Sequence, residues 1–148
     1  MKWIISIMLS VLLNACATSD VNYYDFPVKS SDQITIARDL AWQIKEKHGA
    51  NAVFDFNYPL WSTSTHFSEL LETELRKLGI GVYVSDKPMG QGKHNDLYYT
   101  LSRLNDQQFY IRVVVNHQFS FQRIWIYQDE QLIPLSSTAV FEGVKNRE

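Results

Sequence analysis

Hydrophobic residues recur with helical spacing in two separate stretches of the chain. The first stretch contains Ile36, Ala37, Leu40, Ala41 and Ile44, and the second contains Phe67, Leu70, Leu71, Leu75 and Leu78. Residues at such intervals of three and four lie on one face of a helix. Ser30 and Gln33 have the spacing of a capping box at the start of the first helix. Gly49 and Gly79 follow the two stretches, where glycine commonly ends a helix.

The second half of the chain alternates apolar and polar residues with the period of a β-strand. The pattern runs through residues 96–104, 109–115 and 119–128, and shorter apolar segments lie near residues 53–54 and 80–84. Asn105-Asp106 and Asn116-His117 supply residues that tolerate tight turns between the longer segments. Alternation of this kind is typical of an antiparallel sheet with one face on the core. We therefore expect an α+β domain in which two helices pack on one face of a mostly antiparallel, meander-like sheet.

The segment 119–128 differs from the other expected strands because it is rich in aromatic residues. One of its faces carries Phe119, Phe121, Trp125 and Tyr127, interrupted by Arg123, whereas Ile124 and Ile126 lie on the opposite face. One face can pack on the helices, which leaves the other in need of a cover. That cover is either the tether or tail of the same chain, or another protein. The candidate partner-binding residues are therefore Phe119, Phe121, Trp125, Tyr127, Tyr23 and Tyr24.

The N-terminal residues have the three parts of a secretory signal. Lys2 supplies the positive end, Trp3–Leu13 is an apolar run, and Asn14-Ala15 places a small residue before Cys16. The apolar run is too short for a permanent membrane span, which needs about 20 residues. Leu13-Asn14-Ala15-Cys16 resembles a bacterial lipobox, although Asn14 is unusual at its position. We expect Cys16 to carry acyl chains, including palmitate, and the alternative is an ordinary signal-peptide or core cysteine.

These features divide the chain into four expected parts. Residues 1–15 are a signal peptide, 16–31 the lipidated cysteine and a flexible tether, 32–141 a single α+β domain, and 142–148 a polar tail. Tyr23 and Tyr24 are unusual for a passive tether, so they either pack on the domain or dock to a partner. Ala17 follows the cysteine where an aspartate would favour inner-membrane retention. We therefore expect the protein on the periplasmic face of the outer membrane.

Charge and motif spacing give little indication of catalysis or of nucleic-acid binding. The formal net charge is −2, so no basic surface for nucleic acid is indicated. The single cysteine excludes a disulfide within the chain, and the four histidines lack the spacing of a zinc motif. Residues 90–93, GQGK, do not continue into a phosphate-binding loop. We expect no catalytic, cofactor or metal-binding residues, and the only added groups are the acyl chains on Cys16.

From residue 58 onward, the order of features resembles the TrbH family of conjugal transfer lipoproteins. The residues that carry the match in the second helix and its approach are Tyr58, Pro59, Thr65, Phe67, Leu71, Leu75, Arg76 and Gly79. The later strands are similar to the hairpin and aromatic strand of that family, except that its frequent Arg-x-Tyr pattern is replaced at Arg123 to Trp125. The helix and sheet order also looks like the small modules of secretin rings and the DotD-type lipoproteins.

The resemblance implies an outer-membrane lipoprotein that acts as a structural or assembly subunit of a type IV secretion or conjugative transfer complex. Its partners would be the outer membrane, through the acyl chains, and other periplasmic proteins of a multi-subunit assembly. The alternative is an envelope-biogenesis lipoprotein that chaperones a lipid or an outer-membrane protein. That function would need an internal apolar cavity instead of a filled core.

Overall fold

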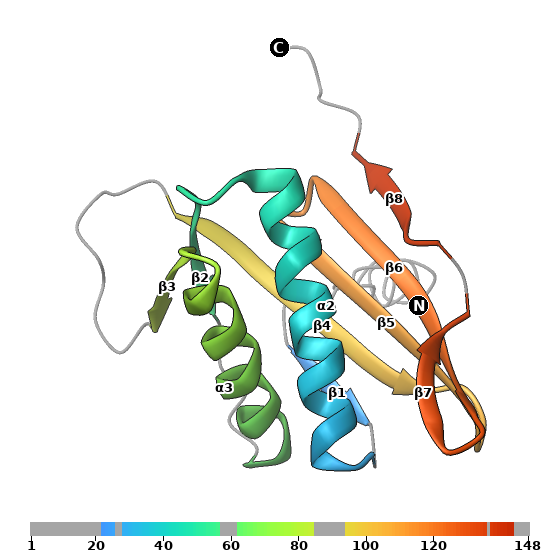
Figure 1. The fold of residues 1–148 in the computed structure, drawn as a ribbon. Coiled ribbons are helices and arrows are strands. Elements are labelled where there is room, and N and C mark those ends of the chain that lie inside the picture. Colours follow the sequence, from blue (N-terminus) through green and yellow to red (C-terminus); the bar gives the residue numbers. More distant parts are fainter. Residues whose placement is uncertain (1–21, 26–27, 57–61, 85–93, 136, 144–148) are drawn as a thin grey trace, which may run out of the picture.

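The computed structural model describes residues 22–25, 28–56, 62–84, 94–135 and 137–143, and these form two helices on one face of an eight-stranded sheet (Figure 1). The helices are α2 (Ser30–His48) and α3 (Ser62–Lys77). The strands are β1 (Tyr23–Asp25), β2 (Val53–Phe56), β3 (Gly81–Val84), β4 (Asn95–Arg103), β5 (Gln108–Val115), β6 (Phe119–Gln128), β7 (Gln131–Pro134) and β8 (Ala139–Glu142). The predicted α+β class is confirmed. The predicted signal peptide and Cys16 lie outside the described residues.

The sheet combines an antiparallel meander with a parallel edge. Its strand order is β3-β2-β4-β5-β6-β7, and the pairs from β4 to β7 are antiparallel, as the alternating pattern predicted. β2 pairs in parallel with both β3 and β4. This arrangement follows from α3, which connects β2 to β3, because parallel neighbours require a crossover instead of a hairpin. Two further strands lie off this order. β1 pairs with the part of β4 that β2 does not reach, and β8 pairs with the part of β6 that β7 does not reach.

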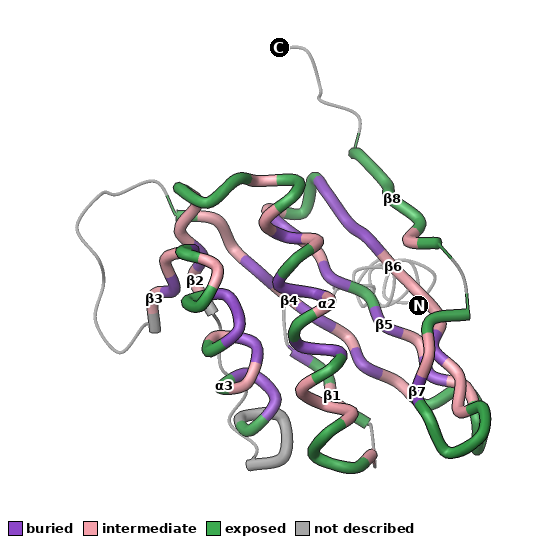
Figure 2. Tube along the Cα trace, in the orientation of Figure 1, coloured by how far each residue is buried: buried purple, intermediate pink, exposed green. Residues whose placement is uncertain are grey.

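Both helices bury the apolar faces that their sequences predict. The five predicted core residues of α2 are its buried residues, and α3 buries Phe67, Leu71 and Leu75 completely. Figure 2 shows buried positions along α2, α3 and the middle strands, whereas β8 is exposed. The core is therefore a single layer of apolar side chains between the helices and one face of the sheet.

The ends of α2 agree with the sequence only in part. Lys29 is the N-cap residue and makes no side-chain cap, so the predicted capping box of Ser30 and Gln33 is wrong. Gln33 instead donates from Nε2 to the carbonyl oxygen of Val28, at 3.2 Å. The other end matches, because Gly49 has a φ of 80° and its N–H donates to the Lys45 carbonyl oxygen at 2.8 Å.

The sheet includes residues that the sequence places in a flexible tether. β1 pairs in parallel with residues 100–102 of β4, because β2 pairs only with residues 95–97 and leaves the rest of that edge without a partner. Asn22 is buried, and its Oδ1 accepts a hydrogen bond from the Tyr99 backbone N–H at 2.9 Å. The ring of Tyr24 lies 5.7 Å from that of Phe67. Residues 22–25 therefore belong to the domain, and α2 also begins before residue 32.

Two turns of the meander have backbone conformations that the sequence only partly indicates. Asn116 and His117 have φ values of 51° and 53°, as expected of the predicted turn between β5 and β6. Asp129 and Glu130, with φ values of 51° and 60°, make a similar turn between β6 and β7 that the sequence analysis missed.

Glu74 links the two helices through a buried carboxylate. Its oxygens accept hydrogen bonds from Lys77 Nζ at 2.6 Å and from Arg38 Nε at 3.4 Å. Burial by itself raises the pKa of Glu74, but the bonds from Lys77 and Arg38 outweigh it and leave the pKa below its usual value. The ion pairs therefore stabilise the fold above the pKa of an unfolded glutamate, and this contribution is lost as the pH falls through the lower folded pKa.

We expect Glu74→Gln to flatten the decrease in melting temperature that accompanies acidification from pH 7. The neutral side chain has no proton to gain, so its part of the acid destabilisation disappears, and the variant is less stable than wild type at pH 7. The check is thermal unfolding across this pH range. Glu130→Gln, on the exposed β6–β7 turn, is the matched control. Identical pH profiles for Glu74→Gln and wild type would contradict the assignment.

Candidate functional site

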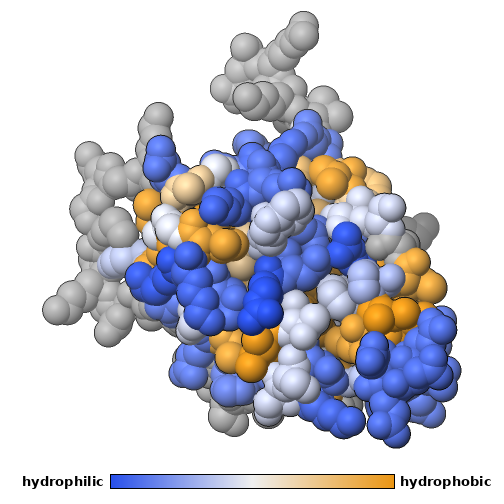
Figure 3. Space-filling model, viewed as in Figure 1, coloured by the Kyte–Doolittle hydropathy of each residue, from blue (hydrophilic) through white to orange (hydrophobic). Residues whose placement is uncertain are grey.

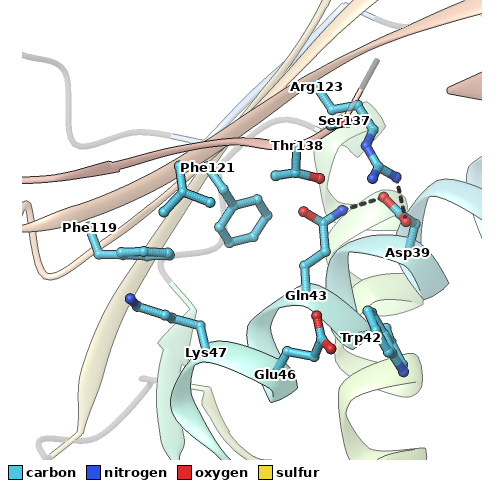
Figure 4. Close-up of a pocket in the computed structure, with 11 residues that line it drawn as sticks. Asp39, Trp42, Gln43, Glu46, Lys47, Phe119, Phe121, Arg123, Ser137 and Thr138 are labelled. Carbon is cyan, nitrogen blue, oxygen red and sulfur yellow. Dashed lines mark hydrogen bonds and ion pairs between the residues drawn. The ribbon is translucent and has the colours of Figure 1, made fainter. Parts of the chain in front are cut away.

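A groove of about 520 Å³ lies between the second half of α2 and strands β6 and β8 (Figure 4). It exists because the sheet extends past α2, and Figure 1 shows no helix in front of β8. One wall comes from α2, the floor from β6 and the other wall from β8 and the two residues that precede it. The lining residues on α2 are Asp39, Trp42, Gln43, Glu46 and Lys47, those on β6 are Phe119, Phe121 and Arg123, and those near β8 are Ser137, Thr138 and Val140.

An ion pair joins α2 to β6 at one end of the groove. Arg123 Nη1 donates to Asp39 Oδ1 at 2.9 Å, and Gln43 Nε2 donates to the other oxygen of the same carboxylate. The side chains of Arg123 and Asp39 keep only 20% and 23% of their surface exposed. Burial raises the pKa of Asp39, and the nearby Arg123 charge and the two hydrogen bonds offset this only in part. The pair explains why Arg123 interrupts an otherwise aromatic strand face.

Three buried polar atoms in the groove have no hydrogen-bond partner within the described part of the chain. They are Gln43 Oε1, Arg123 Nε and Thr138 Oγ1. Figure 4 shows these side chains, from α2, β6 and the segment before β8, directed toward the same space. A buried donor or acceptor without a partner costs about 1–3 kcal/mol. The groove therefore offers one acceptor, one donor and one hydroxyl that the described fold does not use.

The rim of the groove exposes apolar side chains. Trp42 on α2 and Val140 on β8 each keep 53% of their surface exposed on opposite sides of the groove. Figure 3 shows apolar patches separated by hydrophilic surface on this face of the molecule. Exposed tryptophan is the residue type most enriched among residues that dominate binding energy at protein interfaces. The rim therefore has the composition of a binding site for an apolar side chain.

A second hollow continues the groove toward the C-terminal end of α2. It shares Lys47 and Phe119 with the first and extends to Gln118 and Gly143. Lys47 Nζ lies 4.7 Å from the centre of the Phe119 ring and also forms an ion pair with Glu142. The two hollows are therefore neighbours along the second half of α2, with the Lys47–Phe119 contact between them.

The structure answers whether the aromatic face of β6 is core or surface in this chain. Phe119, Phe121 and Trp125 are buried, so they contribute to the core under α2. Tyr127 is partly buried, and its hydroxyl donates to Asp32 Oδ2. The candidate partner-binding residues are therefore not brought together on one open surface, although Phe119 and Phe121 form the floor of the groove.

The two tyrosines of β1 also have different surroundings. Tyr24 packs against the core, whereas Tyr23 keeps 51% of its surface exposed. The groove residues that sequence reasoning missed are Trp42, Gln43 and Thr138. Only Trp42 gave a signal, because this large aromatic residue lies outside the apolar stripe of α2. Gln43 and Thr138 can be recognised as groove residues only from the structure, in which β8 pairs with β6.

A cluster of potential metal ligands lies away from the groove. Asp55 on β2, Asp96 on β4 and His94 just before β4 have ligand atoms within 4.8 Å of one another, and His94 Nε2 lies 3.7 Å from Asp55 Oδ2. Asp55 and Asp96 are direct neighbours in the parallel β2–β4 pair. Carboxylates and imidazole are common ligands of divalent cations. The expectation of no metal ligands rested on sequence spacing, and strand pairing brings together residues that spacing separates.

Comparison with known proteins gives one family. The sequence model described as conjugal transfer protein TrbH matches residues 17–143. No curated protein and no solved structure matches the chain. Neither of the described helices is long and apolar enough to cross a membrane.

Proposed function

Because the chain belongs to the TrbH family of conjugal transfer proteins, we propose that it is an outer-membrane lipoprotein and a structural subunit of a conjugative transfer complex. The family match carries this proposal, since residues 17–143 include every helix and strand described above. Conjugal transfer requires a multi-subunit machine, and the family is not a known family of enzymes. These properties fit a domain that is held at the membrane and binds other proteins of the machine.

The membrane attachment rests on the N-terminal sequence. An apolar run, a small residue and Cys16 follow one another as in bacterial lipoprotein signals. One acyl chain holds a protein only marginally, whereas several chains give stable attachment. Acylation at Cys16 therefore anchors the domain without a membrane-spanning helix, and the residues between Cys16 and Asn22 connect the anchor to β1.

The binding role is supported by the groove beside α2. Its unpaired acceptor, donor and hydroxyl are suited to polar groups, and its apolar rim is suited to a side chain of a protein. A lipid chaperone would instead need a cavity with apolar walls that encloses acyl chains. The groove has charged and amide side chains on its walls, and the space between the helices and the sheet is filled by the core. These observations favour a protein partner over a lipid.

We expect Cys16→Ser to abolish palmitate labelling and to remove the full-length protein from the outer-membrane fraction. Serine has no thiol to acylate, so the anchor is lost. Conjugation frequency should fall to that of a strain that lacks the gene. The measurements are metabolic labelling, membrane fractionation and a mating assay.

Ala17→Ser is the matched control for Cys16→Ser, because it changes the neighbouring residue and keeps the thiol. It should be labelled, fractionate and support transfer as the wild type does. Normal fractionation and normal transfer by Cys16→Ser would overturn the proposed function.

A further inference from the structure

We propose that the groove beside α2 binds an extended, uncharged polypeptide segment of another protein of the transfer complex. That the segment comes from a transfer protein follows from the proposed function. The chemistry of the segment is inferred from the residues of the groove. An apolar side chain of the segment packs on the exposed apolar surface that Trp42 and Val140 provide. Its backbone amides pair with Gln43, Arg123 and Thr138.

The unpaired polar atoms define what the groove recognises. Gln43 Oε1 requires a donor, Arg123 Nε requires an acceptor, and the Thr138 hydroxyl can pair with either. A polypeptide backbone supplies N–H and C=O groups in alternation, so one segment satisfies all three. An acyl chain supplies neither group and would leave these atoms buried without partners, at a cost in affinity.

The charges of the groove select a segment without net charge. Two acidic side chains, Asp39 and Glu46, and two basic side chains, Lys47 and Arg123, line it. Asp39 already pairs with Arg123, and Lys47 pairs with Glu142 at the next hollow. A charged residue of the partner beside either pair would have to compete with it, so these parts of the groove favour backbone dipoles and apolar side chains.

The shape of the groove selects an extended segment over a small molecule. The first hollow, of about 520 Å³, is of the size that binds compact ligands. The second hollow lies next to it along α2, on the other side of the contact between Lys47 and the Phe119 ring. An extended segment that lies along the side of α2 would reach both hollows, whereas a small molecule would occupy only one. Trp42 and Val140 both line the first hollow and both keep exposed apolar surface, which an anchoring side chain can contact.

Site-specific photo-cross-linking in cells tests the proposal with the full-length chain. The photoreactive residue p-benzoylphenylalanine replaces Glu46, which is exposed and lines the groove, in cells that carry the complete transfer system. The control position is Leu104, which is 53% exposed beyond the end of β4 and does not line the groove. We expect the Glu46 probe, and not the Leu104 probe, to link to one contiguous segment of another transfer protein.

A synthetic peptide of the cross-linked segment then tests the contacts. Its affinity for the purified acylated protein in detergent is measured by fluorescence anisotropy. Trp42→Ala should weaken binding by about tenfold or more, the effect of an interface hot spot. Thr138→Val, which keeps the shape of the side chain and removes the hydroxyl, should weaken it less, and Leu104→Ala should leave it unchanged. Melting temperatures of the variants establish that they are folded.

Several outcomes would overturn the proposal. They are cross-links to phospholipid alone, to a second copy of this chain, or at both probe positions equally, and peptide binding that Trp42→Ala does not weaken. These results are distinguishable from failure of the proposed function. Trp42→Ala should still be labelled with palmitate and reach the outer membrane, whereas Cys16→Ser should mislocalise while its groove still binds the peptide.

Discussion

Trp125→Ala is expected to lower the free energy of unfolding by about 3–5 kcal/mol, the largest effect of any substitution considered. Trp125 keeps 3% of its surface exposed and lies opposite Phe109 in the β5–β6 pair. Truncation therefore removes many contacts and leaves a cavity between α2 and the sheet. Chemical denaturation of the full-length protein in detergent measures the change.

Trp125→Phe is the matched variant for this prediction. The indole Nε1 of Trp125 is buried and has no hydrogen-bond partner in the described chain, so phenylalanine loses no bond. It retains one aromatic ring, and its cost should be much smaller than that of alanine. If Trp125→Ala unfolded at the same denaturant concentration as wild type but failed in transfer, Trp125 would act at an interface instead of in the core.

Asn22→Ala is expected to destabilise the protein by about 1–3 kcal/mol, because it leaves a buried backbone N–H without its acceptor. The Asn22 side chain accepts the bond from the Tyr99 N–H, and only 2% of the residue's surface is exposed. The same substitution weakens the attachment of β1 to β4. Denaturation measures the loss, and hydrogen exchange at the Tyr99 amide should become faster than in wild type.

Tyr23→Ala tests whether the effect belongs to Asn22 or to the whole segment. Tyr23 is on the same strand but is half exposed, so its truncation should change stability by less than about 0.5 kcal/mol. An Asn22→Ala variant with wild-type stability and unchanged exchange at Tyr99 would mean that residues 22–25 act as a tether, as the sequence alone predicts.

The predicted anchor and the groove give the chain two functions that reside in different residues. Cys16 lies before β1 and would fix the protein to the membrane, whereas the groove is built from α2, β6 and the last strand. β1 attaches the N-terminal part of the domain to the sheet through its pairing with β4. Substitutions at the anchor and in the groove should therefore affect location and partner binding independently.

The two helices, the antiparallel meander and the family could be identified from the sequence alone. Helical and strand periodicities are local patterns, so the stripe of α2 and the alternation of β4 and β5 can be identified without knowledge of their neighbours. The glycines at positions 49 and 79 mark the helix ends for the same reason, since both have positive φ. The residues of α3 that resembled the TrbH family also lie within the range that the family matches.

Which strand edges are filled, and which side chains converge, depends on contacts between distant parts of the chain. β1 joins β4 because part of that edge lacks hydrogen-bond partners, and no local pattern in residues 23–25 specifies such a distant pairing. The aromatic face of β6 is buried because α2 covers it, while the groove forms where that cover ends. The Gln43, Arg123 and Thr138 side chains meet there from three separate segments. Their proximity depends on long-range strand pairing and helix packing, which periodicity along the chain does not encode.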